Sequence, residues 1–258
     1  MNQDDDYADE WEYEDDEGYE EPYDDDYDDG VDASRTPSRR RPPSPLAFET
    51  FVMVYCIAAL TFVRFHPSPS FISHDWRLFG WFGTNFVVLF CIPALIVSGA
   101  LRIPLSTLGL RWGKVETWLR YMAAYGAVMI PVVLIASRTE AFHSFYPQFH
   151  LARIQFGYFI LSAVGWLFYF FAWEWFFRGL MLFTLAPRIG GGLAILVQMI
   201  PFVMMHYRKV EMEAWSSVVA GIALGLMAFR GKSFIGCWLL HWAVMVGIDL
   251  AVLLWPLR

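Results

Sequence analysis

The chain has 258 residues, of which 57% are hydrophobic and 18% aromatic, a composition typical of membrane proteins rather than of soluble domains. Its net charge of -7 combines two unlike parts. Residues 1–30 contain 17 of the 26 acidic residues and no lysine or arginine, whereas the rest of the chain has 19 basic and 9 acidic residues, a formal charge of +10. An acidic segment therefore precedes a basic membrane body.

Residues 1–45, the acidic segment and the basic stretch after it, are expected to be disordered. Repeats of Asp, Glu and Tyr bury too little apolar surface to offset the entropy lost on ordering. The five tyrosines and Trp11 could bind a basic partner, although a solvated tail is the simpler interpretation. We expect no cleavable signal peptide, because this segment lacks a basic region followed by an apolar one. Arg39–Arg41 precede the first apolar run and predict a cytoplasmic N-terminus.

Residues 46–258 contain a series of apolar segments, most of them near the roughly 20 residues that a bilayer span requires. We therefore predict one all-α domain, a polytopic transmembrane helix bundle of about seven to eight spans, in the inner or plasma membrane of the cell. With a cytoplasmic N-terminus, more Lys and Arg residues fall on the cytoplasmic side than on the other, as the positive-inside rule requires. The segments cover residues 46–63, 81–101, 117–137, 154–185, 190–206, 215–229 and 234–255.

Several residues that often carry chemistry have structural explanations in this chain. Cys56, Cys91 and Cys237 lie in apolar runs without CxxC or His-rich spacing, so we expect buried thiols rather than a disulfide or a zinc cluster. Gly221 and Gly225 form a GxxxG pattern, which favours close helix packing. No internal repeat indicates an inverted-repeat transporter.

The fourth apolar segment carries two opposite charges. Glu174 and Arg178 are four residues apart, which places them on one face of a helix with the acid N-terminal to the base, the better order for pairing. A charge at bilayer depth costs about 2.5–3.5 kcal/mol on insertion scales, so such a pair indicates a functional site. An ion pair that only locks helix packing is the alternative that this segment leaves open.

Two histidines, His206 and His241, lie in later apolar segments. Each alone is more typical of a hydrogen bond that packs helices. Together with Glu174 they form a set that could hold a divalent metal in a site with an open position, or activate a water directly. A desolvated Glu174 also qualifies as a general base. The segment boundaries place the two histidines at different depths, so their convergence requires a helix that is re-entrant, strongly tilted or miscounted.

These residues fall into three motifs, which are Trp173–Gly179, Phe202–His206 and His241–Met245. Their order and spacing resemble the E-E-x-x-x-R-G, F-x-x-x-H and H-x-x-x-N motifs of the CAAX protease and bacteriocin-processing family of intramembrane metalloproteases, which includes the type II CAAX prenyl endopeptidases. The resemblance covers the motif core, residues 172–245. Order and spacing together are far more specific than any one motif.

The resemblance implies an endopeptidase that cleaves a peptide bond in or near the membrane. It implies catalytic roles for Glu174, His206 and His241, which would act on water and could bind zinc, and for Arg178, which would fix Glu174 and hold it ionised. The implied partners are membrane lipid and a membrane-associated or prenylated peptide or protein. No nucleic-acid partner is expected. A small transporter with a Glu/His proton relay is a weaker alternative.

Two positions depart from the family pattern. Trp173 stands where the family has the first Glu of its pair, and Met245 stands where it has Asn. Met245 cannot donate a hydrogen bond to an oxyanion. Either Glu174 takes over as the base, or the chain is an inactive relative that binds a membrane partner or a prenyl-like ligand in the same cavity.

Overall fold

The computed structural model describes residues 45–66, 69, 71–207 and 209–255. Apart from Pro45, the segment predicted to be disordered lies outside these residues. Every regular element among the described residues is helical, which confirms the predicted fold class. The α-helices are α1 (Pro45–Phe65), α2 (Arg77–Phe86), α3 (Ile92–Leu95), α4 (Val115–Ala136), α5 (Glu140–Phe145), α6 (Phe156–Glu174), α7 (Leu182–Ile189), α8 (Gly191–Met205), α9 (Glu211–Gly231) and α10 (Ile235–Leu254).

Shorter helical turns connect or interrupt these helices. Three are 3-10 turns, η2 (His74–Trp76), η5 (Leu105–Leu108) and η6 (His150–Arg153). Three are π-helical, η3 (Val87–Cys91), η4 (Ile96–Ala100) and η7 (Trp175–Met181). Because a π-helical turn shifts the side chains that follow it around the helix axis and often marks a functional site, the position of η7 within the Glu/Arg motif is notable.

Six helical stretches in the described part of the chain are long and apolar enough to cross a bilayer. Two of them are composite, His74–Ala100 and Phe156–Ile189. The predicted number of spans is higher because α8 counted as one of them. With 15 residues, α8 is about 22 Å long, shorter than the roughly 30 Å hydrocarbon core. The chain is therefore a polytopic membrane protein, and the cytoplasmic position of its N-terminus stays a prediction.

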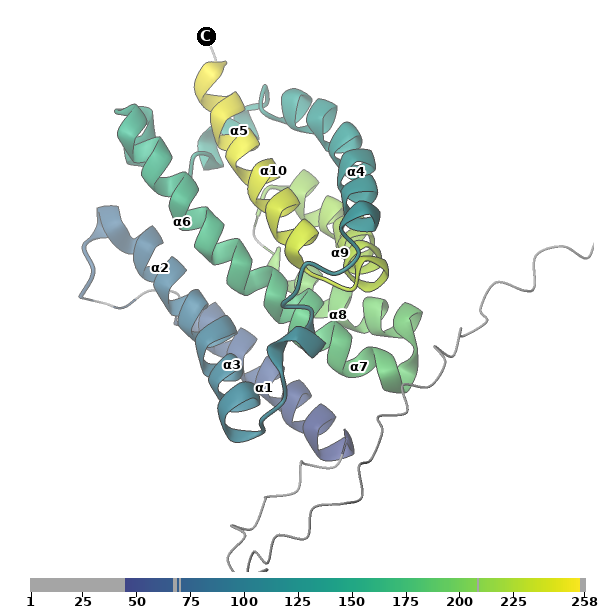
Figure 1. Cartoon of the computed structure of the whole chain (residues 1–258). Helices are drawn as coiled ribbons and strands as arrows, with labels where there is room; N and C mark the ends of the chain where they lie inside the picture. Colours follow the sequence, from purple (N-terminus) through teal and green to yellow (C-terminus); the bar gives the residue numbers. More distant parts are fainter. Residues whose placement is uncertain (1–44, 67–68, 70, 208, 256–258) are drawn as a thin grey trace, which may run out of the picture. The chain divides into compact units, whose positions relative to one another are not determined.

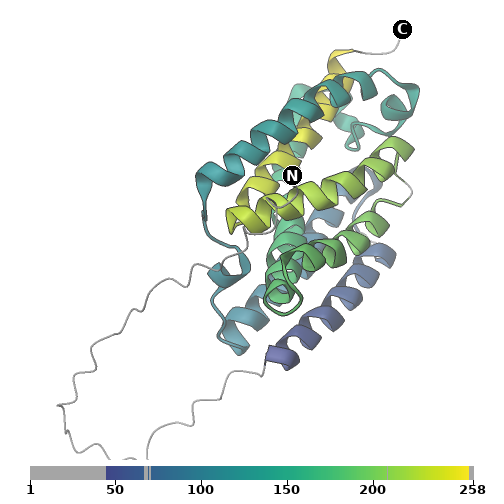
Figure 2. The same cartoon turned by 90° about the vertical axis from the view of Figure 1, so that its right-hand side faces the viewer.

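The composite helix α6–η7–α7 makes extensive packing contacts within the bundle. Its α6 part packs against α2 and α10, and its α7 part against α8 (Figures 1 and 2). On the other side, α4 packs against both α9 and α10, and α8 against α9. The buried core is strongly aromatic and includes Trp166, Trp175, Phe176, Phe177 and Phe202.

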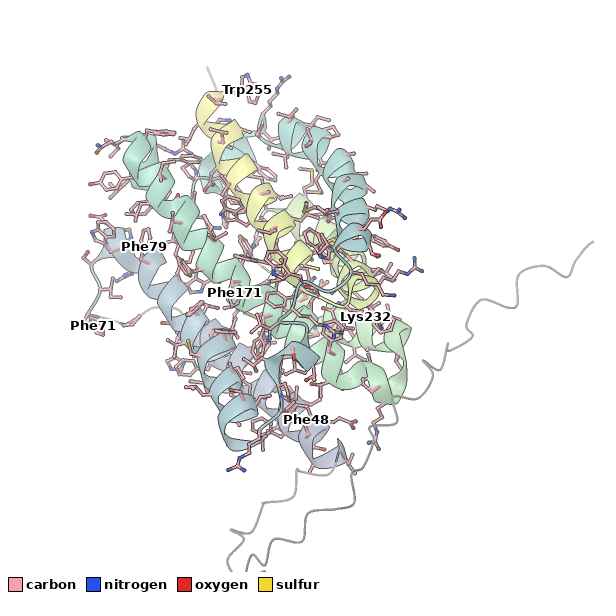
Figure 3. All side chains as sticks on the ribbon, viewed as in Figure 1. Phe48, Phe71, Phe79, Phe171, Lys232 and Trp255 are labelled. Carbon is pink, nitrogen blue, oxygen red and sulfur yellow. The ribbon has the colours of Figure 1, made fainter. Side chains whose placement is uncertain are left out.

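Apolar side chains also cover the outer faces of the long helices. Figure 3 shows carbon-rich side chains projecting outward along them. Val54, Val128 and Phe168, on three different helices, are each more than half exposed. In water such surfaces would be costly, whereas hydrocarbon solvates them, so the exposed face agrees with a membrane environment.

Glycines set the path of α8. The turn between α7 and α8 is made at Gly190, whose φ of 78° lies in the left-handed region that glycine adopts without strain. The chain therefore reverses within one residue, and α8 packs back against α7. Across α8, the GxxxG glycines face its side chains: a Cβ on Gly225 would lie 2.8 Å from Ile195 and one on Gly221 2.6 Å from Met199.

This close approach predicts that Gly225→Ala destabilises the bundle. The added methyl has to displace the branched Ile195 side chain, and overpacking of this kind costs about 1–3 kcal/mol. Gly126→Ala in α4 is the matched control, because it gains the same helix propensity and its Cβ meets nothing within 4 Å. Thermal unfolding in detergent measures both variants, and an equal midpoint for the two would contradict the packing described.

Candidate active site

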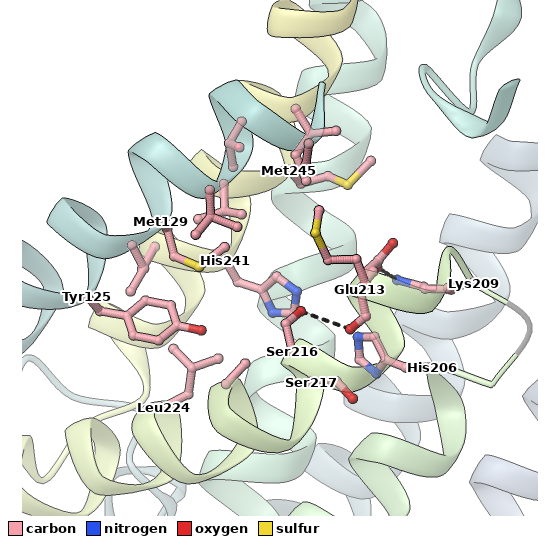
Figure 4. A pocket seen from close by; sticks show the side chains of 18 of the residues that line it. Tyr125, Met129, His206, Lys209, Glu213, Ser216, Ser217, Leu224, His241 and Met245 are labelled. Atoms are coloured by element: carbon pink, nitrogen blue, oxygen red, sulfur yellow. Dashed lines mark hydrogen bonds and ion pairs between the residues drawn. The ribbon is translucent and has the colours of Figure 1, made fainter. Parts of the chain in front are cut away.

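The candidate site is a cavity lined mainly by α4, α9 and α10, with Phe202 and His206 from the C-terminal end of α8 on its wall (Figure 4). It offers about 90 Å³ of space, enough for several water molecules. The walls are mostly apolar. Seven residues bring polar or ionisable groups to them: Tyr125, His206, Lys209, Glu213, Ser216, Ser217 and His241.

Glu174, Arg178 and His241 form a connected group beside this cavity. The Nδ1 atom of His241 lies 2.5 Å from Oε1 of Glu174. Nη1 of Arg178 lies 3.2 Å from the same oxygen and 3.1 Å from Oε2. The Glu174 and Arg178 side chains are fully buried, and His241 is largely buried. The guanidinium also lies over the Phe202 ring, 4.1 Å from its centroid, a cation–π contact that offsets part of its desolvation.

Hydrogen bonds assign the same tautomer to both histidines. An ionised carboxylate can only accept, so Nδ1 of His241 carries the proton that it donates to Glu174. Nδ1 of His206 lies 2.7 Å from the carbonyl oxygen of Phe202, which also can only accept. On both rings Nε2 is therefore left with a free lone pair. Because both imidazoles line the cavity, the site contains two acceptors suited to binding and activating water.

The structure brings all four predicted site residues into one region. His206 follows the last residue of α8, and the Phe202 ring lies 4.6 Å from its ring and 6.2 Å from that of His241. The depth conflict seen in the sequence disappears because α8 is short and folds back on α7. Glu174, by contrast, does not line the cavity; it contacts the cavity through His241.

The two departures from the family pattern also lie at the site. The Trp173 indole is buried and packs edge-on to His206, with 6.3 Å between ring centroids. Met245 lines the cavity one helical turn after His241 (Figure 4). An aromatic ring therefore stands beside one histidine, and a thioether stands beside the other.

The residues present do not fit the zinc site expected from the sequence. In the part of the chain that the structure describes, no three His, Cys, Asp or Glu side chains are grouped so that they could hold a metal ion. Of the expected ligands, Glu174 is turned toward Arg178 and His241 instead. Zinc stays a prediction, and we assign no chemical step to it.

Sequence reasoning missed the polar groups of the α8–α9 junction. Lys209 Nζ lies 2.5 Å from Oε1 of Glu213, and the Tyr146 hydroxyl donates to Oε2 of the same carboxylate. Burial, followed by the Glu213 charge, raises the pKa of Tyr146 well above its usual value, so Tyr146 keeps its proton. The i,i+4 spacing of Lys209 and Glu213 signals an ion pair, but only the fold shows that it lines the cavity.

The segment that builds this site matches a known family. Residues 155–246 match the model of the type II CAAX prenyl endopeptidases, Rce1-like. The chain carries an Rce1-like domain. The match runs from the start of α6 into α10 and contains all four predicted site residues, which confirms the family resemblance of the three motifs. Searches of curated proteins and of solved structures gave no significant match.

Proposed function

We propose that the chain is an intramembrane endopeptidase that uses a histidine-activated water to cleave a peptide bond in or near the bilayer. The observation that carries the proposal is the hydrogen bond between Glu174 and His241, next to a cavity with room for water. The Rce1-like domain supports the same reaction class. The substrates that this proposal implies are membrane-associated or prenylated peptides and proteins.

In the proposed reaction His241 is the general base. A cavity water gives one proton to Nε2 of His241 while its oxygen attacks the carbonyl carbon of the substrate. The C–N bond then breaks, and His241 returns the proton to the leaving nitrogen. Glu174 orients the imidazole through Nδ1 and stabilises the imidazolium that forms, the role of the acid in a Ser-His-Asp triad. His206 accepts a hydrogen bond from the second hydrogen of the water and so fixes its orientation.

The sequence suggests Glu174 as the general base, whereas in this proposal Glu174 orients His241. Its carboxylate is fully buried, paired with Arg178 and absent from the cavity wall, so water reaches His241 rather than Glu174. Arg178 pairs with the carboxylate and holds it in place, which maintains the hydrogen bond to His241. The replacement of the family's first Glu by Trp173 therefore does not deprive the site of its base, because the base is an imidazole.

Peptide cleavage in lipid vesicles tests the proposal. The purified chain would be reconstituted with a pool of prenylated and unmodified membrane peptides in buffer made with ¹⁸O-water, and products would be identified by mass spectrometry. We expect fragments whose new carboxyl group carries one ¹⁸O, and at least about a hundredfold slower cleavage by His206→Ala. No fragments from the wild type, or equal rates for the two proteins, would contradict the proposal.

A further inference from the structure

Hydrolysis of a peptide bond needs a hydrogen-bond donor for the oxyanion that forms on the carbonyl oxygen, and such donors contribute strongly to catalysis. Met245, at the position where the family motif has Asn, has no donor to offer. The Trp173 indole N–H is buried and is not on the cavity wall. The donor has to come from another residue that lines the cavity.

Most side-chain hydrogen-bond donors on the cavity wall already have an acceptor within the protein. The Ser216 and Ser217 hydroxyls donate to backbone carbonyls of their own helix, at 3.0 and 2.6 Å. Lys209 donates one of its three N–H groups to Glu213. The N–H groups of His206 and His241 are bound to Phe202 and Glu174.

Among the described residues of the wall, Tyr125 has a side-chain donor with no hydrogen-bond partner. Its hydroxyl makes no hydrogen bond to another described residue, and Figure 4 shows the phenol directed from α4 into the cavity. The α4 face that carries it is otherwise apolar, with Met129 one turn further on. His206 and His241 line the same cavity, so the phenol belongs to the same site.

We infer that Tyr125 is a further catalytic residue, which donates its O–H to the oxyanion of the tetrahedral intermediate in place of the missing Asn. The phenol keeps its proton throughout, so no bond to Tyr125 forms or breaks. The hydrogen bond strengthens as negative charge collects on the carbonyl oxygen, and it therefore stabilises the transition state more than the bound substrate. A tyrosine suits this role because its ring is held by packing and its hydroxyl is its only polar atom. The inference rests on the proposed function for its reaction.

Two readouts on Tyr125→Phe test the inference. The first is cleavage, for which we expect kcat to fall about a hundredfold with KM nearly unchanged. The second needs no turnover: the affinity of an apolar phosphinate peptide, whose tetrahedral anion mimics the intermediate, compared with that of the corresponding amide peptide. Tyr125→Phe should weaken phosphinate binding at least about tenfold and leave amide binding unchanged.

Tyr121→Phe is the matched control, since Tyr121 lies one turn earlier on α4 and its hydroxyl accepts from Arg230 outside this cavity. It should change neither readout. A wild type that does not cleave, but prefers the phosphinate through Tyr125, would overturn the proposed function and sustain only the part of the inference that makes Tyr125 a donor to a tetrahedral anion. Unchanged kcat in Tyr125→Phe would overturn the inference alone. A wild type that neither cleaves nor prefers the phosphinate would overturn both.

Discussion

Replacing His241 with alanine is expected to lower kcat for peptide cleavage by about 10²–10⁴, the usual contribution of a general base. The reason is geometric: His241 contacts the buried Glu174 carboxylate through one ring nitrogen and lines the cavity. Without the ring, water is left without the acceptor that removes its proton. Because the cavity is otherwise mostly apolar, we expect KM to change little.

His150→Ala is a suitable control for this variant. His150 is exposed on η6 and does not line the cavity, so its removal should leave kcat within about twofold of the wild type. Steady-state cleavage in vesicles gives kcat and KM for both variants, and a melting curve shows whether either has lost its fold. A folded His241→Ala protein with wild-type kcat would exclude His241 as the base.

The second large effect concerns stability. Arg178→Met is expected to lower the free energy of unfolding by about 3–5 kcal/mol, because it leaves the fully buried Glu174 without its cation. Met occupies similar space and keeps the contact with the Phe202 ring apolar, so the loss reports mainly on the charge. Unfolding in mild detergent, followed by the loss of helical signal, measures it.

The exposed pair of Arg120 and Glu116 on α4 provides the comparison, since it has the same i,i+4 spacing. Both of its side chains are more than three-quarters exposed, so Arg120→Met should cost at most about 1 kcal/mol. Equal losses in the two variants would mean that the Glu174–Arg178 pair behaves like a surface ion pair, contrary to its burial.

Local patterns in the sequence were sufficient for the fold class and for one contact of the site. Apolar runs of bilayer length predicted the helices, because a membrane helix satisfies its own backbone hydrogen bonds. The spacing of Glu174 and Arg178 predicted their ion pair, because residues four apart on a helix are neighbours. Both inferences depend only on residues close together in the chain.

The other contacts depend on residues far apart in the chain. Glu174 and His241 are separated by 67 positions, so the sequence could suggest that both belong to the site but not that they are hydrogen-bonded to each other. The apolar run at residues 190–206 counts as a span by composition, whereas α8 (Gly191–Met205) is shorter than the roughly 30 Å hydrocarbon core. The sequence alone does not single out Tyr125, because its proposed role follows from the hydrogen-bond acceptors that the other donors of the cavity wall already have.

The most direct test of the account is a double-mutant cycle on Glu174 and His241. Cleavage would be measured for the wild type, Glu174→Gln, His241→Ala and the double variant, with folding checked by melting curves. If Glu174 acts only through His241, the double variant should cleave no more slowly than His241→Ala alone, because the residues work as a unit. Losses that multiply, each by about 10² or more, would show that Glu174 acts on the water independently and would contradict the account.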